Sequence, residues 1–107
     1  MSGNDGILTL GATALHRLYR TRELSPIEYF EAVKNQIETR DPEYGAIVDT
    51  YFEEADSQAR EAEKRFTAGD ATGALEGMLV AIKDETPVKG KRTTSGSLLL
   101  RDHVDSA

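Results

Sequence analysis

Five consecutive apolar residues, Met78 to Ile82, constrain the fold of this chain more than any other feature. A short apolar run without polar alternation is typical of a strand buried on both faces of a parallel or mixed sheet. Such a strand needs neighbouring strands and covering helices, because unpaired backbone groups are costly when they are buried. The rest of the 107 residues offer three helical patterns and one weak further strand. We therefore predict an α/β fold whose sheet is incomplete within this chain.

Three segments carry helix-forming patterns, and we expect helices at 12–21, 26–40 and about 52–68, with a short weak strand at 46–50. The second helix has the best start signal, because Ser25 and Glu28 form an S-x-x-E capping box around a proline at the first helical position. We expect this helix to end before Asp41-Pro42, since the residue before a proline avoids the α region.

The third helix is expected to start with a second capping box, Thr50-x-x-Glu53, and to end at Gly69, which suits a left-handed terminal position. Residues 1–8 are expected to be flexible, residues 9–77 to be mainly helical, and residues 78–107 to form a strand and a loop. The chain is thus interpreted as one segment, residues 1–107, of a larger domain.

Composition argues against several functional classes. The 19 acidic and 13 basic residues give a net charge of −6, which repels nucleic acid and anionic membranes. Cysteine is absent, and His16 and His103 are far apart in the sequence, so we expect no disulfide, metal site or cofactor. No stretch has the length of a membrane span or the pattern of a secretory signal. We expect a cytoplasmic protein whose partners include neither nucleic acid nor membrane.

Lys83 is the strongest candidate for a catalytic residue. It follows the apolar run at the expected end of the strand, where α/β folds commonly place their ligand sites. A free lysine is a poor base at neutral pH because its pKa is about 10.4, but burial disfavours the ammonium form. A lysine prepared in this way can remove a proton from a serine hydroxyl or form a Schiff base. Spacing alone favours a simpler alternative, a surface lysine that ends a strand.

The region after this lysine is rich in hydroxyl groups and glycine. Residues 93–97 (TTSGS) could offer backbone N–H groups to an anion or an oxyanion, although such loops are more often ordinary turns. The basic run at 89–92 (KGKR) is expected to be a solvated loop. Asp84 and Glu85 are adjacent, so on a strand they would point to opposite faces and form no paired-carboxylate site.

The stretch LEGMLVAIKDETPVKGKRTTSGS, residues 75–97, resembles the segment around the catalytic lysine of the amidase signature family. The family form is close to L-x-G-[IV]-P-x-x-[IV]-K-D-N-x-x-V-x-G-x-x-T-T-x-G-S. The matching positions are Leu75, Gly77, Ile82, Lys83, Asp84, Val88, Gly90, Thr93, Thr94, Gly96 and Ser97. Upstream, RTRELSP at 20–26 is similar to the family's entry into its second helix, and the resemblance covers about residues 8–107.

This resemblance implies a hydrolase that cleaves the carbon–nitrogen bond of small-molecule amides, with a Ser–cis-Ser–Lys triad on a large α/β/α domain. By position, Lys83 would be the base of that triad. The Gly-Ser-Ser-Gly signature that supplies both serines in the family does not occur in the 107 residues. We therefore expect a truncated, N-terminal portion of such an enzyme, inactive alone because a base without its nucleophile has nothing to activate.

Four positions depart from the family pattern. Ala74, Glu76 and Leu79 stand where proline, histidine and proline are usual, and Glu85 replaces the usual asparagine. Glu85 puts a carboxylate beside Lys83, which either opposes the use of this lysine as a base or alters which substrates fit. Two alternatives stay open. One is a lysine Schiff-base enzyme, and the other is a non-catalytic helical interaction module, completed by a partner chain, by a complementing C-terminal segment or by self-association.

Overall fold

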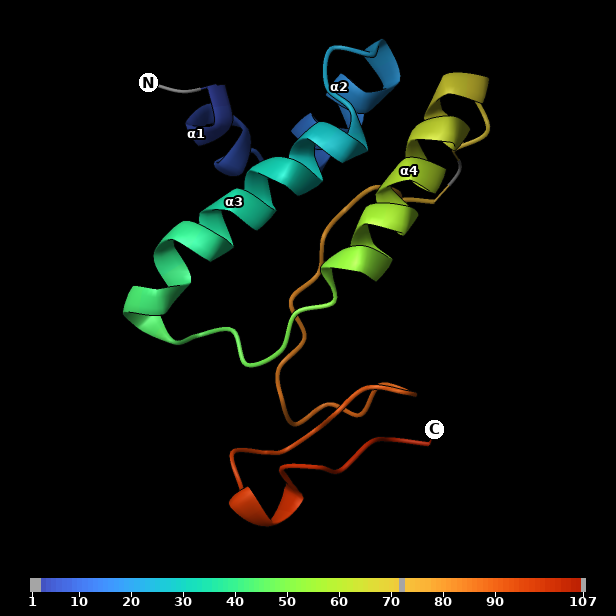
Figure 1. Cartoon of the computed structure of the whole chain (residues 1–107). Helices are drawn as coiled ribbons and strands as arrows, with labels where there is room; N and C mark the ends of the chain where they lie inside the picture. Colours follow the sequence, from blue (N-terminus) through green and yellow to red (C-terminus); the bar gives the residue numbers. More distant parts are fainter. Residues whose placement is uncertain (1–2, 72, 107) are drawn as a thin grey trace.

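The computed structural model of this protein describes residues 3–71 and 73–106. Its elements are α1 (Gly3–Leu8), α2 (Ala12–Thr21), α3 (Pro26–Tyr44), α4 (Phe52–Ala68) and one 3₁₀ turn, η1 (Leu98–Leu100). Helices α3 and α4 are the two long helices in Figure 1 and pack against each other, and α1 contacts α3. After α4 the chain passes back beside the helices and ends in a loop region, drawn orange to red in Figure 1.

The predicted α/β fold class is wrong for this chain, which is helical. The described residues contain no β-strand, and their single β-type pairing is an isolated antiparallel bridge between Arg92 and Val104. The expected strands at 46–50 and 78–82 are irregular backbone. An apolar run forms a strand only when a neighbouring segment pairs with its backbone, and no described segment pairs with either stretch. Val80 and Ile82 are consequently exposed, by 70% and 56%.

Helix α3 begins where the sequence predicts and ends later. The Ser25 hydroxyl accepts a hydrogen bond from the Glu28 N–H, and the Glu28 carboxylate accepts one from the Ser25 N–H, which confirms the capping box. The helix then continues through Pro42 instead of ending at residue 40. The carboxylate of Asp41 accepts the backbone N–H groups of residues 46 and 47 at 2.8 and 3.0 Å. These bonds secure the helix end despite the hydrogen bond that a proline cannot make.

The other two predicted helices have the predicted bounds, α2 at Ala12–Thr21 and α4 at Phe52–Ala68. Helix α4 is followed by Gly69 with a φ of 76°, the left-handed conformation expected there. At its start the cap residue is Tyr51 and no side chain caps the helix, so the predicted Thr50–Glu53 capping box is wrong. Helix α1 lies in the stretch 1–8, whose flexibility stays a prediction, and residues 1 and 2 lie outside the described residues. None of the described helices is long and apolar enough to cross a membrane.

The core of the helical part is a small apolar cluster between α2, the start of α3 and the end of α4. Its buried members are Leu15, Tyr19, Leu24 and Phe66. Tyr19 is completely inaccessible, and its ring centre lies 5.2 Å from that of Phe66. Burial, with a smaller effect of Tyr29, raises the pKa of the Tyr19 phenol. Each fully buried Leu or Phe side chain contributes about 1.5–3 kcal/mol, so these few residues carry much of the stability of the helices.

The segment that follows α4 is bound to this core largely through its backbone. Nε2 of His16 donates to the carbonyl oxygen of Glu76 at 2.9 Å, and the Tyr19 hydroxyl donates to the carbonyl oxygen of Gly77 at 3.1 Å. Nε of Arg65 donates to the Glu76 carboxylate at 2.6 Å. Gly77 has a φ of 78°, and a Cβ there would lie 2.9 Å from the Tyr19 ring. Glycine is therefore required by both conformation and space, and the start of the apolar run is held in place.

The molecule is more extended than a compact domain of its length. Its Cα radius of gyration is 15.5 Å, whereas a compact chain of this size has about 13 Å. The difference arises because residues 83–105, called here the terminal loop unit, extend away from the helices (Figure 1). The described residues thus form two parts, a helical unit (residues 3–71 and 73–78) and the terminal loop unit, which residues 79–82 connect. The candidate site lies in the terminal loop unit.

Candidate functional site

Lys83 lies at the beginning of the terminal loop unit, directly after the exposed apolar run. Its side chain is 76% exposed, and its Nζ lies 3.0 Å from Oε1 of Glu85, which is also exposed. The expectation that burial at the end of a strand would keep this amine dry is wrong for this structure. The reason is that residues 3–71 and 73–106 contain no neighbouring strand that could cover the end of the run.

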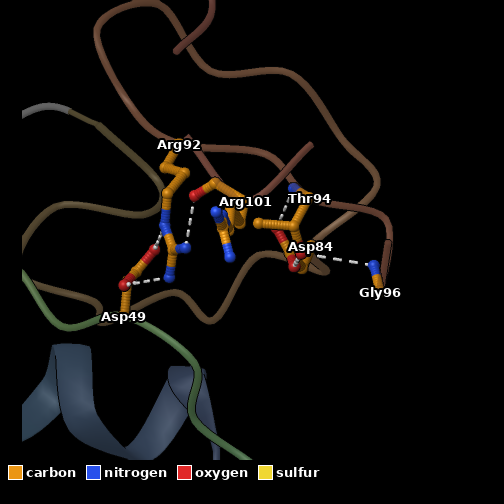
Figure 2. Close-up of polar contacts among 6 residues, drawn as sticks. All are labelled: Asp49, Asp84, Arg92, Thr94, Gly96 and Arg101. Atoms are coloured by element: carbon orange, nitrogen blue, oxygen red, sulfur yellow. Dashed lines mark hydrogen bonds and ion pairs between the residues drawn. The ribbon is translucent and has the colours of Figure 1, made fainter. Parts of the chain in front are cut away.

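Asp84, the next residue, has its carboxylate turned into the loop unit (Figure 2). Oδ1 accepts the backbone N–H of Thr94 at 2.9 Å, and Oδ2 accepts the Thr94 hydroxyl. The carbonyl oxygen of Asp84 accepts the N–H of Ser95 at 2.8 Å. The two bonds from Thr94, with a contribution from the positive charge of Arg92, lower the pKa of the Asp84 carboxyl. Asp84 therefore joins the lysine segment to the hydroxyl-rich loop ten residues later.

A second carboxylate binds the neighbouring threonine. The Asp105 carboxylate accepts the hydroxyl of Thr93 and, at 3.3 Å, the backbone N–H of Val88. Nε2 of His103 lies 3.1 Å from its other oxygen. The bond from Thr93, followed by those from Val88 and His103, lowers the pKa of the Asp105 carboxyl. The adjacent threonines Thr93 and Thr94 are only 7% and 8% exposed, and each is bound by a different aspartate.

The backbone N–H groups of residues 95–97 are used inside the loop. Ser95 donates to Asp84, Gly96 donates to the Thr94 hydroxyl at 3.2 Å, and Ser97 donates to the Thr94 carbonyl at 2.8 Å. These donors are therefore not free to hold an anion or an oxyanion, which argues against that use of the TTSGS loop. Ser95 and Gly96 have φ values of 51° and 74°, so two successive left-handed residues form the tight turn.

The basic run at 89–92 is not simply solvated. The Arg92 guanidinium donates to both carboxylate oxygens of Asp49, at 2.9 and 3.0 Å, and to the carbonyl oxygen of Arg101 at 2.6 Å (Figure 2). Lys91 forms an ion pair with Glu54 and lies 4.1 Å from the ring centre of Tyr51. Both cations contact the linker between α3 and α4 or the start of α4, so they attach the terminal loop unit to the helical unit.

Sequence reasoning missed these polar partners because contacts between loops follow no helical or strand period. The partners of His16 and His103 were missed for the same reason. The pairing of Asp84 with Thr94 had one indirect signal, since both belong to the motif by which the chain resembles the amidase signature family. In the described part of the chain, no cluster of three or more His, Cys, Asp or Glu side chains could hold a metal ion.

Comparison with protein families identifies the class of protein to which this chain belongs. The sequence profile of the Amidase family matches residues 28–107, a stretch that includes most of α3, all of α4 and the terminal loop unit. The match contains Lys83, Asp84 and the TTSGS loop. The chain therefore belongs to the amidase family, which confirms the resemblance noted from its motifs.

The similar curated proteins include several A subunits of glutamyl-tRNA(Gln) amidotransferase. The protein from Desulforamulus reducens is 34% identical over 98 residues, which cover 92% of this chain and 20% of the relative. That from Neorickettsia sennetsu is 35% identical over 101 residues (94% and 21%), and that from Geobacter metallireducens is 39% identical over 90 residues (84% and 18%). The chain spans about a fifth of the length of these relatives. No solved structure matches it significantly.

Proposed function

We propose that this chain is the lysine-bearing, N-terminal portion of an amidase-type hydrolase that cleaves the carbon–nitrogen bond of a small-molecule amide. The observation that carries the proposal is the family match over residues 28–107, a range that contains Lys83. We propose Lys83 as the catalytic lysine because the surrounding motif resembles the family's lysine segment. The relatives are named amidotransferases, and the release of an amide nitrogen by C–N cleavage is chemistry common to hydrolysis and transfer.

In the proposed mechanism, Nζ of Lys83 acts as the base. The neutral amine takes a proton from one serine hydroxyl, which in turn takes the proton of the nucleophilic serine. The serine oxygen attacks the amide carbon, and the proton passes to the leaving nitrogen as the C–N bond breaks. Water then attacks the acyl-serine ester and releases the acid. Both serines belong to the Gly-Ser-Ser-Gly signature, which the 107 residues do not contain.

The position of Lys83 supports the second part of the proposal, that these 107 residues alone do not hydrolyse amides. A lysine serves as a base when burial disfavours its ammonium form. Here the side chain is 76% exposed and paired with Glu85. We propose that the serine-bearing segment both supplies the nucleophile and covers this amine.

The first test is an assay of the 107-residue chain with simple aryl amides and esters. We expect no turnover above that of a Lys83→Ala variant. Turnover that depends on Lys83 in this chain would contradict the proposed need for the serines.

The second test places the chain in a protein that carries the serines. The matching 90 residues of the Geobacter metallireducens protein are exchanged for those of this chain, and amide hydrolysis is measured. We expect Lys83→Ala to abolish hydrolysis, whereas Lys89→Ala, at another exposed lysine, leaves it unchanged. Activity that survives Lys83→Ala would remove Lys83 from the proposed role.

An alternative function, a non-catalytic interaction module, is favoured by the exposed apolar side chains of the terminal loop unit. Leu98 is 82% exposed and Leu99 is 95% exposed, in addition to the exposed apolar run. Sedimentation of the purified chain distinguishes the two ideas. A stable homodimer, together with an inactive exchanged protein, would favour the module, whereas a monomer and an active, Lys83-dependent exchanged protein would favour the hydrolase.

We also propose a cytoplasmic location, in keeping with an acidic chain that contains no cysteine. Cell fractionation tests this, and recovery of the protein in a membrane or secreted fraction would contradict it.

A further inference from the structure

Apolar packing does not set the position of the lysine segment. Met78 packs against the helical core, but nearer to the lysine Val80 is 70% exposed and Ile82 is 56% exposed. Lys83 itself contacts Glu85 through its amine, and its carbonyl oxygen accepts the N–H of Thr86 at 3.0 Å in a local turn. These contacts of Lys83 lie within three residues of the lysine, so they cannot fix its place relative to the rest of the loop unit.

Asp84 makes the contacts that reach further. Its two carboxylate oxygens accept two donors of a single residue, the N–H and the hydroxyl of Thr94, and its carbonyl accepts the N–H of Ser95. Two bonds between one carboxylate and one residue define an orientation as well as a distance, and bonds to a charged acceptor are about twice as strong as neutral ones. The Thr94 side is itself firmly placed, because Thr94 is 8% exposed and its carbonyl oxygen accepts the N–H of Ser97 at 2.8 Å.

We propose that Asp84 is a positioning residue for Lys83: its carboxylate holds the lysine backbone at one place relative to the loop of residues 94–97. This inference rests on the proposed role of Lys83 as a base. Asp84 and Lys83 have different roles in this proposal. Asp84 is bound into the loop, while the Lys83 side chain remains exposed and its amine is paired with the exposed Glu85, where groups brought by another segment can reach it. Because the backbone of Lys83 is already fixed, its amine loses less conformational freedom when it reaches a serine hydroxyl than the amine of a mobile lysine would.

The first test uses the 107-residue chain and backbone amide hydrogen exchange by NMR. Asp84→Ala and Thr94→Val are expected to speed exchange at residues 94–96 by about tenfold or more and to shift the amide signals of Lys83 and Glu85. Thr94→Ser keeps the hydroxyl donor and should restore both. Thr93→Val is the matched control, because it removes the bond to Asp105 and should shift residues 103–105 while leaving the Lys83 amide unchanged.

Several outcomes of this test would overturn the inference. One is a Lys83 amide that does not respond to either Asp84→Ala or Thr94→Val, and another is a Lys83 amide that responds equally to Thr93→Val. If Asp84→Ala disorders the whole loop unit, the inference is tested by comparing the Lys83 amide signal in Thr94→Val and Thr94→Ser. These two substitutions change only one methyl or hydroxyl group.

The second test measures kinetics in the exchanged amidase described above. Asp84→Ala is expected to lower kcat about tenfold or more with KM little changed, because both oxygens of this carboxylate are already bound to Thr94. Thr94→Val should lower kcat in the same direction, and Thr94→Ser should restore it. If Lys83→Ala abolishes activity while Asp84→Ala and Thr94→Val keep kcat within about twofold, the positioning inference fails and the proposed function stands. If Lys83→Ala is itself active, the proposed function fails.

Discussion

The helical unit and the terminal loop unit are held together by different forces. In the helical unit, apolar side chains such as Tyr19 and Phe66 pack around a small core, and the helices supply their own backbone hydrogen bonds. In the loop unit the buried residues are polar, Thr93, Thr94 and Asp105, and each takes part in a hydrogen bond between a hydroxyl and a carboxylate. One part of the protein therefore depends on the hydrophobic effect and the other on ionised aspartates.

This difference bears on the candidate site. Lys83 belongs to the part with little apolar packing, and its surroundings are ordered by two carboxylates and by the cations that reach the α3–α4 linker. The two units should therefore respond to different perturbations. The following experiments ask whether they can be disrupted separately.

The largest effect is expected from Tyr19→Ala, which removes the one completely inaccessible large side chain among the described residues. The variant also leaves the Gly77 carbonyl without its hydroxyl donor. We expect a loss of about 3–5 kcal/mol in the free energy of unfolding, measured by urea denaturation and far-UV circular dichroism. Tyr44→Ala is the control, since Tyr44 lies in α3 and is 67% exposed. An equal effect of both variants would contradict the assignment of the core to Tyr19.

Gly77→Ala and Gly90→Ala form a matched pair, one in each unit. Both glycines have a φ of 78°, so alanine at either position incurs a left-handed backbone cost of about 1–2 kcal/mol. At Gly77 the new Cβ would also lie 2.9 Å from the Tyr19 ring, whereas at Gly90 nothing lies within 4 Å. We expect Gly77→Ala to destabilise the protein by about 1–3 kcal/mol more than Gly90→Ala. Equal melting temperatures for the two variants would show that the contact with Tyr19 is not tight.

Acidification should disrupt the loop unit before the helices. The pKa values of Asp84 and Asp105 are lower in the folded chain than in an unfolded one. Their contribution to stability is therefore complete well above the ordinary Asp pKa of about 3.9 and is lost as the pH falls through the lower folded values. We expect the chemical-shift dispersion of the amide signals of residues 93–96 to decrease as the pH drops below about 4, while the helical circular dichroism signal persists. Loss of helix and loop signals at the same pH would contradict separate responses.

The smallest effect is expected at the contact between the two units. Arg92→Lys replaces a guanidinium that binds both oxygens of Asp49 with a single-point donor, at a site about one third exposed. We expect amide exchange at residues 91–93 to quicken by no more than about fivefold, and the effect to shrink at high salt. Arg101→Lys, at a 71% exposed side chain, should change nothing. A salt-independent effect of Arg92→Lys would indicate that shape rather than charge joins the units.

The helices could be predicted where their signals are local. The patterns at 12–21 and 52–68 and the Ser25–Glu28 capping box depend on neighbours within one turn, and the structure has helices α2 and α4 at those bounds. The end of α3 at Tyr44 could not be predicted from residue preferences, which place the end before Pro42. The helix continues because the Asp41 carboxylate accepts hydrogen bonds from residues 46 and 47, and such contacts are not part of a helix propensity. The strand at 78–82 failed because pairing is not a property of one segment.

The amino-acid sequence by itself determined the three main helices and membership of the amidase family. Helical periodicity, helix caps and the motif around Lys83 all depend on residues that are close together in the sequence. Only the tertiary structure decided that Val80 and Ile82 are exposed, that Lys83 lies in solvent and that Asp84 and Asp105 each bind one of two adjacent threonines. Strand formation and burial depend on what other segments bring alongside, and hydrogen bonds between loops follow no sequence period. Those outcomes are therefore set by the arrangement of the chain in space.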